Sequence, residues 1–158
     1  MLDCSPVSMS LEYKRGIHMR KEIVKDPVVL SQKSIPFDLT DEADIELLGD
    51  MIDTAEAHKE NCVGLAAIQV GVPKRVILVR QGNIFTPFIN PVIIKKSPST
   101  YVTEEGCLSL DGTRSVKRHH SVKVTWTTFT GKKQVKEFKG FVAEIIQHEV
   151  DHCDGVLI

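Results

Sequence analysis

Residues 140–155 read GFVAEIIQHEVDHCDG, and this stretch near the end of the chain decides the fold. It contains no proline, and its apolar residues face several directions around a helix axis. This pattern predicts a helix that packs on more than one side. Gly155 suits the position just after a helix, where a left-handed backbone conformation is common. We therefore expect a largely buried helix that stops at this glycine.

The same stretch contains the pattern H-E-x-x-H in His148, Glu149 and His152. Helix residues at i and i+4 lie roughly 40° apart around the axis and about 6 Å along it, so both imidazoles can reach one divalent cation. Glu149 would project beside that cation, which suits a base acting on water. Two solvated histidines and a surface glutamate are the alternative. A histidine pair inside a buried helix needs a partner, and a metal ion provides one.

Length and composition bound the class of protein. The chain has 158 residues with 42% hydrophobic and 26% charged residues and a net charge of −1, which predicts a single globular domain. This balance favours neither a broad basic surface nor a direct nucleic-acid partner. The clusters Lys117-Arg118-His119-His120 and Lys132-Lys133 are predicted to be solvated loop charge. No apolar run approaches the roughly 18 residues that span a bilayer, and no secretory signal is evident, so we expect a soluble, unexported protein.

Residues 1–18 show no clear periodicity and precede a second methionine, Met19. We predict a flexible N-terminal extension or tag at 1–18 and one catalytic domain at 19–158. Asp3 and Glu12 interrupt the basic character of an organellar targeting segment, which makes that alternative the weaker one. Without an export signal, the four cysteines are expected to stay reduced.

The remaining pattern predicts an α+β fold: mostly antiparallel strands packed around the C-terminal H-E-x-x-H helix, with one long N-terminal amphipathic helix. Thr40 is the predicted N-cap of the latter, which continues to about His58. Strand-like runs occupy 75–79, 87–94, 121–127 and 134–138, and the last two form a hairpin. Pro87 and Pro91 predict that the second run is an edge strand or bends.

A catalytic site of this kind needs a third protein ligand. The metzincin pattern would place a histidine six residues after His152, but Ile158 stands there, so we look upstream. Cys107 is the best-placed candidate, because a glycine precedes it and a thiolate suits a borderline-soft metal. A small buried hydrophobe is its alternative role. Cys153 points about 100° away from its neighbour His152 and is weaker, Cys62 stays open, and Cys4 lies in the loose tail.

Gln69 is an isolated amide in a segment of small residues, 61–73, that precedes a predicted strand. A tight turn would explain the glycines in this segment. If a site lies nearby, Gln69 is a candidate donor to a carbonyl oxygen or oxyanion.

Taken together, three stretches of the chain resemble the peptide deformylase family. They are Cys62-Val63-Gly64-Leu65-Ala66-Ala67-Ile68-Gln69, Glu105-Gly106-Cys107-Leu108-Ser109 and Gln147-His148-Glu149-Val150-Asp151-His152. The resemblance covers roughly residues 19–158. It implies a role for each of the following residues: Cys107, His148 and His152 as metal ligands; Glu149 as general acid and base; Gln69 and the backbone N–H of Leu108 facing the formyl oxygen; Val63, Gly64 and Gly106 contacting the peptide backbone; and Phe141 and Ile145 forming the methionine pocket.

The resemblance also implies the reaction, which is hydrolysis of the N-formyl group from the initiator methionine of new polypeptides, with release of formate. The cofactor would be one divalent metal ion, Fe²⁺ by preference, with Zn²⁺, Ni²⁺ or Co²⁺ as substitutes. Partners would be N-formylmethionyl peptides and the ribosome, although no long C-terminal extension follows Gly155 for ribosome docking. Bacterial cytoplasm is the expected location, and monomer and dimer both stay open.

Two residues depart from the family pattern. Cys62 replaces a glycine beside the substrate backbone, and Glu144 places a carboxylate near the methionine pocket unless it faces outward. Two alternatives therefore remain: a deformylase-like paralogue that binds metal or formylated peptides with little turnover, and a zincin-type peptidase.

Overall fold

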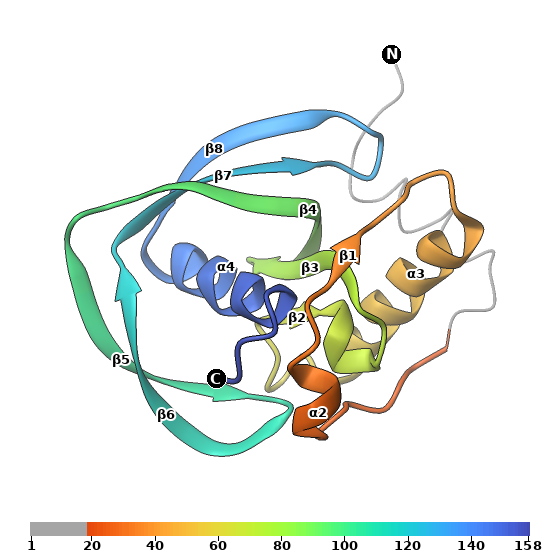
Figure 1. Cartoon of the computed structure of the whole chain (residues 1–158), viewed down its shortest axis with the longest axis horizontal. Helices are drawn as coiled ribbons and strands as arrows, with labels where there is room; N and C mark the ends of the chain where they lie inside the picture. Colours follow the sequence, from red (N-terminus) through yellow and green to blue (C-terminus); the bar gives the residue numbers. More distant parts are fainter. Residues whose placement is uncertain (1–18) are drawn as a thin grey trace.

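The computed structural model describes residues 19–158 and has a mixed α+β fold, made mostly of strands with a helix at the C-terminal end (Figure 1). The predicted extension at 1–18 lies outside the described residues. The helices are α2 (Pro27–Leu30), α3 (Glu42–Ala57), the 3₁₀ helix η1 (Ala67–Val70) and α4 (Gly140–Cys153). The strands are β1 (Ile35–Pro36), β2 (Gly64–Ala66), β3 (Lys74–Gln81), β4 (Ile84–Lys96), β5 (Thr100–Cys107), β6 (Leu110–His119), β7 (Ser121–Thr127) and β8 (Lys133–Lys139).

The strands form two sheets that surround α4 (Figure 1). In the larger sheet the order is β1-β3-β4-β7-β8, with β2 added to β3, and β5 and β6 pair separately. Every pairing is antiparallel except that of β1 with β3. The predicted hairpin is confirmed, since β7 and β8 pair from Thr127 and Lys133 outward.

Strand β4 decides between the two predicted alternatives, an edge strand or a bend. It pairs with β3 on one side and β7 on the other, so it is not an edge strand. The predicted bend is present, because the register with β7 shifts between Ile89 and Val92. Asn90 there has a positive φ of 50°, and its side chain exchanges hydrogen bonds of 2.8 and 3.0 Å with the backbone of Phe37. Pro91 is tolerated because the ladder with β7 is interrupted at this bulge, and Pro87 lies before Ile89, the first β4 residue that pairs with β7.

Strand β3 separates two hydrophobic cores. Ile77 and Val79 belong to the core that contains the α4 residues Ile146 and Val150. On the opposite face, Val76 and Leu78 join the core that contains α3, so β3 is buried on both sides. This double burial explains its continuous apolar sequence. It also holds α4 in the interior of the molecule.

Helix α4 ends as its sequence predicts. Gly155 has a φ of +76°, its N–H donates to the carbonyl of His152, and the N–H of Val156 donates to Asp151. These are the two hydrogen bonds of a Schellman motif. A Cβ at Gly155 would lie 2.5 Å from the carbonyl oxygen of Ser31, so packing requires glycine as well.

Helix α3 begins one residue later than predicted. Its N-cap is Asp41, whose carboxylate accepts from the N–H of Ala43, so the prediction of Thr40 as the cap is wrong. Thr40 instead donates its N–H and hydroxyl to Asp38. A carboxylate is a good cap because it satisfies a free N–H and interacts favourably with the helix dipole.

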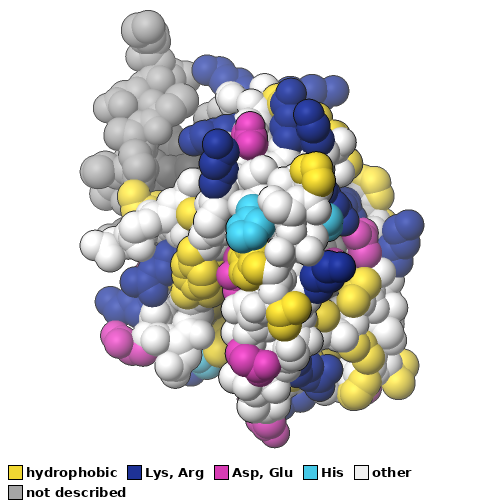
Figure 2. Space-filling model, turned by 90° about the vertical axis from the view of Figure 1, so that its left-hand side faces the viewer, with side chains coloured by type: hydrophobic (Ala, Val, Ile, Leu, Met, Phe, Trp, Pro, Cys, Tyr) yellow, Lys and Arg dark blue, Asp and Glu magenta, His cyan; other side chains and the backbone are white. Residues whose placement is uncertain are grey.

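The outer surface is of ordinary composition. Figure 2 shows basic, acidic and hydrophobic side chains interspersed over the face that is seen from the left of Figure 1. Within residues 19–158, no helix is long and apolar enough to cross a membrane.

Candidate metal centre and active site

Three side chains converge at the point where the end of β5 meets α4. His148 and His152 lie one turn apart on the helix, with their Nε2 atoms 3.2 Å from each other. Cys107, the last residue of β5, brings its Sγ within 3.4 Å of His152 Nε2. The donor atoms of the three residues all lie within 4.8 Å of one another. This is the Cys107, His148 and His152 set proposed from the sequence.

The donor set fits one divalent cation. The Nδ1–H of His148 donates to Glu105 Oε1 at 2.8 Å, which leaves the Nε2 lone pair directed at the convergence point. Both imidazoles are buried, and two nitrogens and a sulfur form a set that suits zinc or iron. Burial lowers the pKa of His148, but the neighbouring Cys107 thiol and the hydrogen bond to Glu105 outweigh it and raise that pKa to about 10. The negative groups around His148 therefore favour positive charge on this ring, which a bound cation would supply in place of the Nε2 proton, whereas burial and the charge of His148 lower the pKa of His152 to about 3.

Glu149 lies beside the three donors and is only 4% exposed. Its Oε2 has no hydrogen-bond partner among the described residues. Burial raises the pKa of Glu149 to about 7, against the opposing charge of His148. A Cβ at Gly64 would lie 2.7 Å from Glu149 Oε1, so only glycine on β2 leaves room for this carboxylate. A buried carboxyl with a pKa near neutrality can both accept and donate a proton.

The amide of Gln69 faces the same place from η1. Its Oε1 accepts from the N–H of Ala66 at 3.0 Å, which fixes the orientation of the amide. Nε2 donates to Ser109 Oγ at 3.2 Å and to Cys107 Sγ at 3.4 Å. The NH₂ group of Gln69 therefore points toward the Cys107 thiol.

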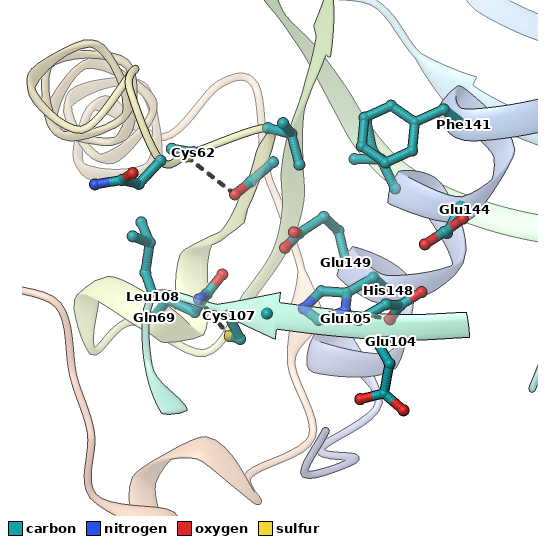
Figure 3. Close-up of a pocket in the computed structure, with 15 residues that line it drawn as sticks. Cys62, Gln69, Glu104, Glu105, Cys107, Leu108, Phe141, Glu144, His148 and Glu149 are labelled. Atoms are coloured by element: carbon teal, nitrogen blue, oxygen red, sulfur yellow. Dashed lines mark hydrogen bonds and ion pairs between the residues drawn. The ribbon is translucent and has the colours of Figure 1, made fainter. Parts of the chain in front are cut away.

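These residues border one pocket of about 240 Å³ (Figure 3). Val63, Gly64, Gly106 and Leu108 also line it, as do Phe141 and Ile145 of α4. His152 does not line the pocket and lies against the other two donors. Phe141 is 61% exposed at the rim. A Cβ at Gly106 would meet its nearest neighbour, the carbonyl of Gly112, only at 4.0 Å, so this glycine leaves space at the pocket wall.

The comparisons agree with this geometry. A family model described as polypeptide deformylase matches residues 20–158. A peptide deformylase of Clostridium beijerinckii is 49% identical over 142 residues, covering 89% of this chain and 100% of that protein. The chain belongs to the polypeptide deformylase family.

Solved structures of the family share the fold. A class I type b peptide deformylase from Acinetobacter baumannii, solved with Met-Ala-Ser bound, has a TM-score of 0.79 and 33% identity, and the match covers 89% of this chain and 97% of that one. The Thermotoga maritima peptide deformylase has a TM-score of 0.78 and 35% identity, with 90% and 95% covered.

The two other cysteines of the described region differ from Cys107. Cys153 is 0% exposed in the α4 core, and burial raises its pKa to about 12. Cys62 lines the pocket but is 2% exposed, and its Sγ donates to the carbonyl of Gly64 at 3.2 Å. Burial raises its pKa to about 12 as well, so both are held as neutral thiols. Cys62 thus adds little reactivity to the pocket wall.

Arg118 is the residue that the sequence prediction misplaced. It is not solvated loop charge: it is 6% exposed on β6 and donates twice to Glu105, at 2.9 and 2.7 Å. A third bond of 2.6 Å reaches Asp151 of α4. Because Glu105 also accepts from His148, Arg118 holds the group that orients a candidate metal ligand. The alternation of β5 and β6 was the available signal, but both strands were missed.

Proposed function

We propose that this chain is an active deformylase, a hydrolase that removes the N-formyl group from the initiator methionine of newly made polypeptides and releases formate. The observation that carries this proposal is the convergence of Cys107, His148 and His152 within 4.8 Å beside the buried Glu149. Family membership supports the same reaction. The related Acinetobacter structure with Met-Ala-Ser bound supports a substrate of this length.

Cys107, His148 and His152 would hold one divalent metal ion, Fe²⁺ in the cell, with Zn²⁺, Ni²⁺ and Co²⁺ as substitutes. When bound, the ion supplies Lewis acidity that lowers the pKa of water and polarises the formyl oxygen. The Glu105 and Arg118 pair keeps the His148 ring in the orientation that presents Nε2. Both histidine rings are buried, and Cys107 is partly exposed to the pocket.

Glu149 would move the proton. Its carboxylate takes a proton from the attacking water as the new C–O bond forms to the formyl carbon. The protonated carboxyl then donates to the methionine nitrogen as the C–N bond breaks, which leaves formate and a free amine. The unpartnered Oε2 and the pKa of about 7 suit both steps.

The remaining pocket residues would bind and orient the substrate. Gln69 Nε2 and the backbone N–H of Leu108 donate to the formyl oxygen as negative charge develops there. Val63, Gly64 and Gly106 contact the peptide backbone. Phe141 and Ile145 supply apolar surface for the methionine side chain, and both line the pocket. We also infer that residues 19–158 act as one catalytic domain in the bacterial cytoplasm.

The test is formate release from formyl-Met-Ala-Ser by protein loaded with Fe²⁺ or Ni²⁺ under anaerobic conditions. We expect turnover that falls by at least about 10³-fold in Glu149→Ala, because the proton acceptor and donor is removed. Thermal unfolding of the variant checks that it folds. Turnover no higher than that of Glu149→Ala would favour the paralogue that binds without much catalysis. Cleavage of unformylated peptide bonds at a comparable rate would favour a zincin-type peptidase.

A further inference from the structure

One wall of the pocket is acidic. Glu104, Glu105 and Glu144 line the side formed by β5 and α4, and Figure 3 shows their side chains on the side of the pocket opposite Cys62 and Leu108. Among residues 19–158, no lysine or arginine lines the pocket. Glu144 therefore does not face outward, which was the alternative left by the sequence. It contributes a carboxylate to the cavity that receives the peptide.

Most other charges of the site are already balanced. Glu105 is bound to Arg118, with 2.7 Å between Oε1 and Nη2. A divalent cation would be offset by the Cys107 thiolate and the Glu149 carboxylate. Glu104 and Glu144 remain, and neither forms an ion pair with a cation among residues 19–158. The pocket therefore carries an excess of negative charge on one wall.

Glu144 is fixed in position. Tyr101, near the start of β5, donates its hydroxyl to Glu144 Oε2 at 2.8 Å, and the Tyr101 ring packs against His120 with centroids 4.8 Å apart. Glu144 lies one turn before His148 on α4 and one turn after Phe141. Its carboxylate is thus held in the pocket wall between the metal donor His148 and Phe141 at the rim (Figure 3). Glu104 is exposed and accepts from Thr113 at 3.1 Å.

We propose that Glu144, positioned by Tyr101, is a specificity residue that makes this enzyme prefer formylated chains with a lysine or arginine in the two residues after methionine. The inference rests on the proposed deformylase function. A formylated N-terminus carries no α-ammonium group, so only side chains can bring positive charge to the acidic wall. The same wall disfavours aspartate and glutamate at these positions through like-charge repulsion.

The experiment compares kcat/KM for formyl-Met-Lys-Ser, formyl-Met-Gln-Ser and formyl-Met-Glu-Ser, and for the matched set with the variable residue in third position. In one set or both, we expect the lysine peptide to exceed the glutamate peptide by about five- to tenfold at low salt, falling toward about twofold at about 0.5 M salt. The difference should lie in KM, because the charge contact is made equally in the ground and transition states.

Variants test whether Glu144 and Tyr101 cause this preference for lysine. Glu144→Gln should reduce the lysine-to-glutamate ratio to about threefold or less, and Tyr101→Phe should reduce it partly, since the charge stays but its position is lost. Glu137→Gln on β8 removes an exposed carboxylate outside the pocket and should leave the ratio unchanged. Ratios are taken within each variant, so a general change in activity cancels. An equal ratio in Glu144→Gln and the native protein would overturn the proposal, as would the absence of any preference.

The two proposals fail in different ways. If the native protein releases no formate from the neutral peptide formyl-Met-Gln-Ser, the proposed function is wrong. Calorimetric binding of Met-Lys-Ser and Met-Glu-Ser needs no turnover and still measures the charge preference. Equal affinities for these two peptides, with the same result when the variable residue is third, would overturn the specificity proposal independently.

Discussion

Helices α3 and α4 are of similar length but differ in how much of their surface is buried. α3 buries one face, on which Leu47, Leu48 and Met51 pack against β3 and its neighbours. α4 is buried on almost every side from Ile145 to Val150, and that interior includes polar side chains. Burying polar groups is costly unless they are paired. The hydrogen-bond partners of the buried polar residues in each helix therefore indicate which of these residues have a structural role and which have a chemical one.

In α3 the buried charge is fully partnered. Asp44 accepts from the N–H of Asp38 at 2.8 Å and pairs with Lys74 at 3.2 Å. In α4, Gln147 is likewise satisfied, because its amide bonds to both the N–H and the carbonyl of His119. Glu149 differs, since its Oε2 has no partner among the described residues. A buried carboxylate left without a partner indicates a functional group.

The largest expected effect is on metal affinity, and it distinguishes Cys107 from Cys153, the two cysteines near the α4 histidines. Cys107→Ser should reduce metal affinity by more than about 100-fold, because a hydroxyl is a poor replacement for a thiolate ligand. Cys153→Ser should keep the metal and instead lose about 1–3 kcal/mol of stability, because a hydroxyl is buried in an apolar core. Elemental analysis and urea unfolding measure the two quantities. Equal metal loss in both variants would mean that the wrong thiol was chosen.

The second prediction concerns the charges that support each helix. Arg118→Met leaves the carboxylates of Glu105 and Asp151 without their cation and should cost about 3–5 kcal/mol, as for other broken buried ion pairs. Lys74→Met, which removes the cationic partner of Asp44 in α3 and leaves its hydrogen bond from the N–H of Asp38, should cost about 1 kcal/mol since the lysine side chain is partly exposed.

Urea unfolding of both variants at the same pH provides the measurement. Arg118→Met should also lower metal content, because Glu105 no longer holds the His148 ring firmly. Similar costs for the two variants, with metal content unchanged, would contradict the positioning role of Arg118.

A third substitution tests the purely structural role of α3. Leu48 is 0% exposed, and Leu48→Ala should destabilise the fold by about 3 kcal/mol through lost burial and a cavity. Because α3 contributes no residue to the pocket, kcat per folded molecule should change by less than about twofold. Thermal unfolding and formate release check this pair of expectations. A much larger fall in kcat would show that α3 influences the site.

The sequence predicted α4, the β7 and β8 hairpin and the metal-site candidates because these segments have strong local signals. It missed β5 and β6, whose many exposed charged residues, such as Glu104 and Lys117, hide the strand pattern in a two-stranded ribbon. The burial of Arg118 was therefore not predicted either, because its partners come from distant parts of the chain. Similarly, no local pattern predicts that Tyr101 meets Glu144, 43 residues away.

The smallest expected effect concerns the charge state of Glu144. Burial raises its pKa above the ordinary value, and the nearby Glu105 carboxylate adds to this, while the bond from Tyr101 and the charge of Arg118 oppose it. As pH rises through that pKa, the carboxyl loses its proton and its attraction for a lysine side chain grows. The ratio of kcat/KM for formyl-Met-Lys-Ser over formyl-Met-Gln-Ser should therefore rise about two- to threefold as the pH increases from below the pKa of Glu144 to above it. The titration of Glu149 affects both substrates alike and cancels in this ratio. If the ratio stays flat in the native protein, or rises equally in Glu144→Gln, Glu144 is not the group whose titration controls the preference for lysine.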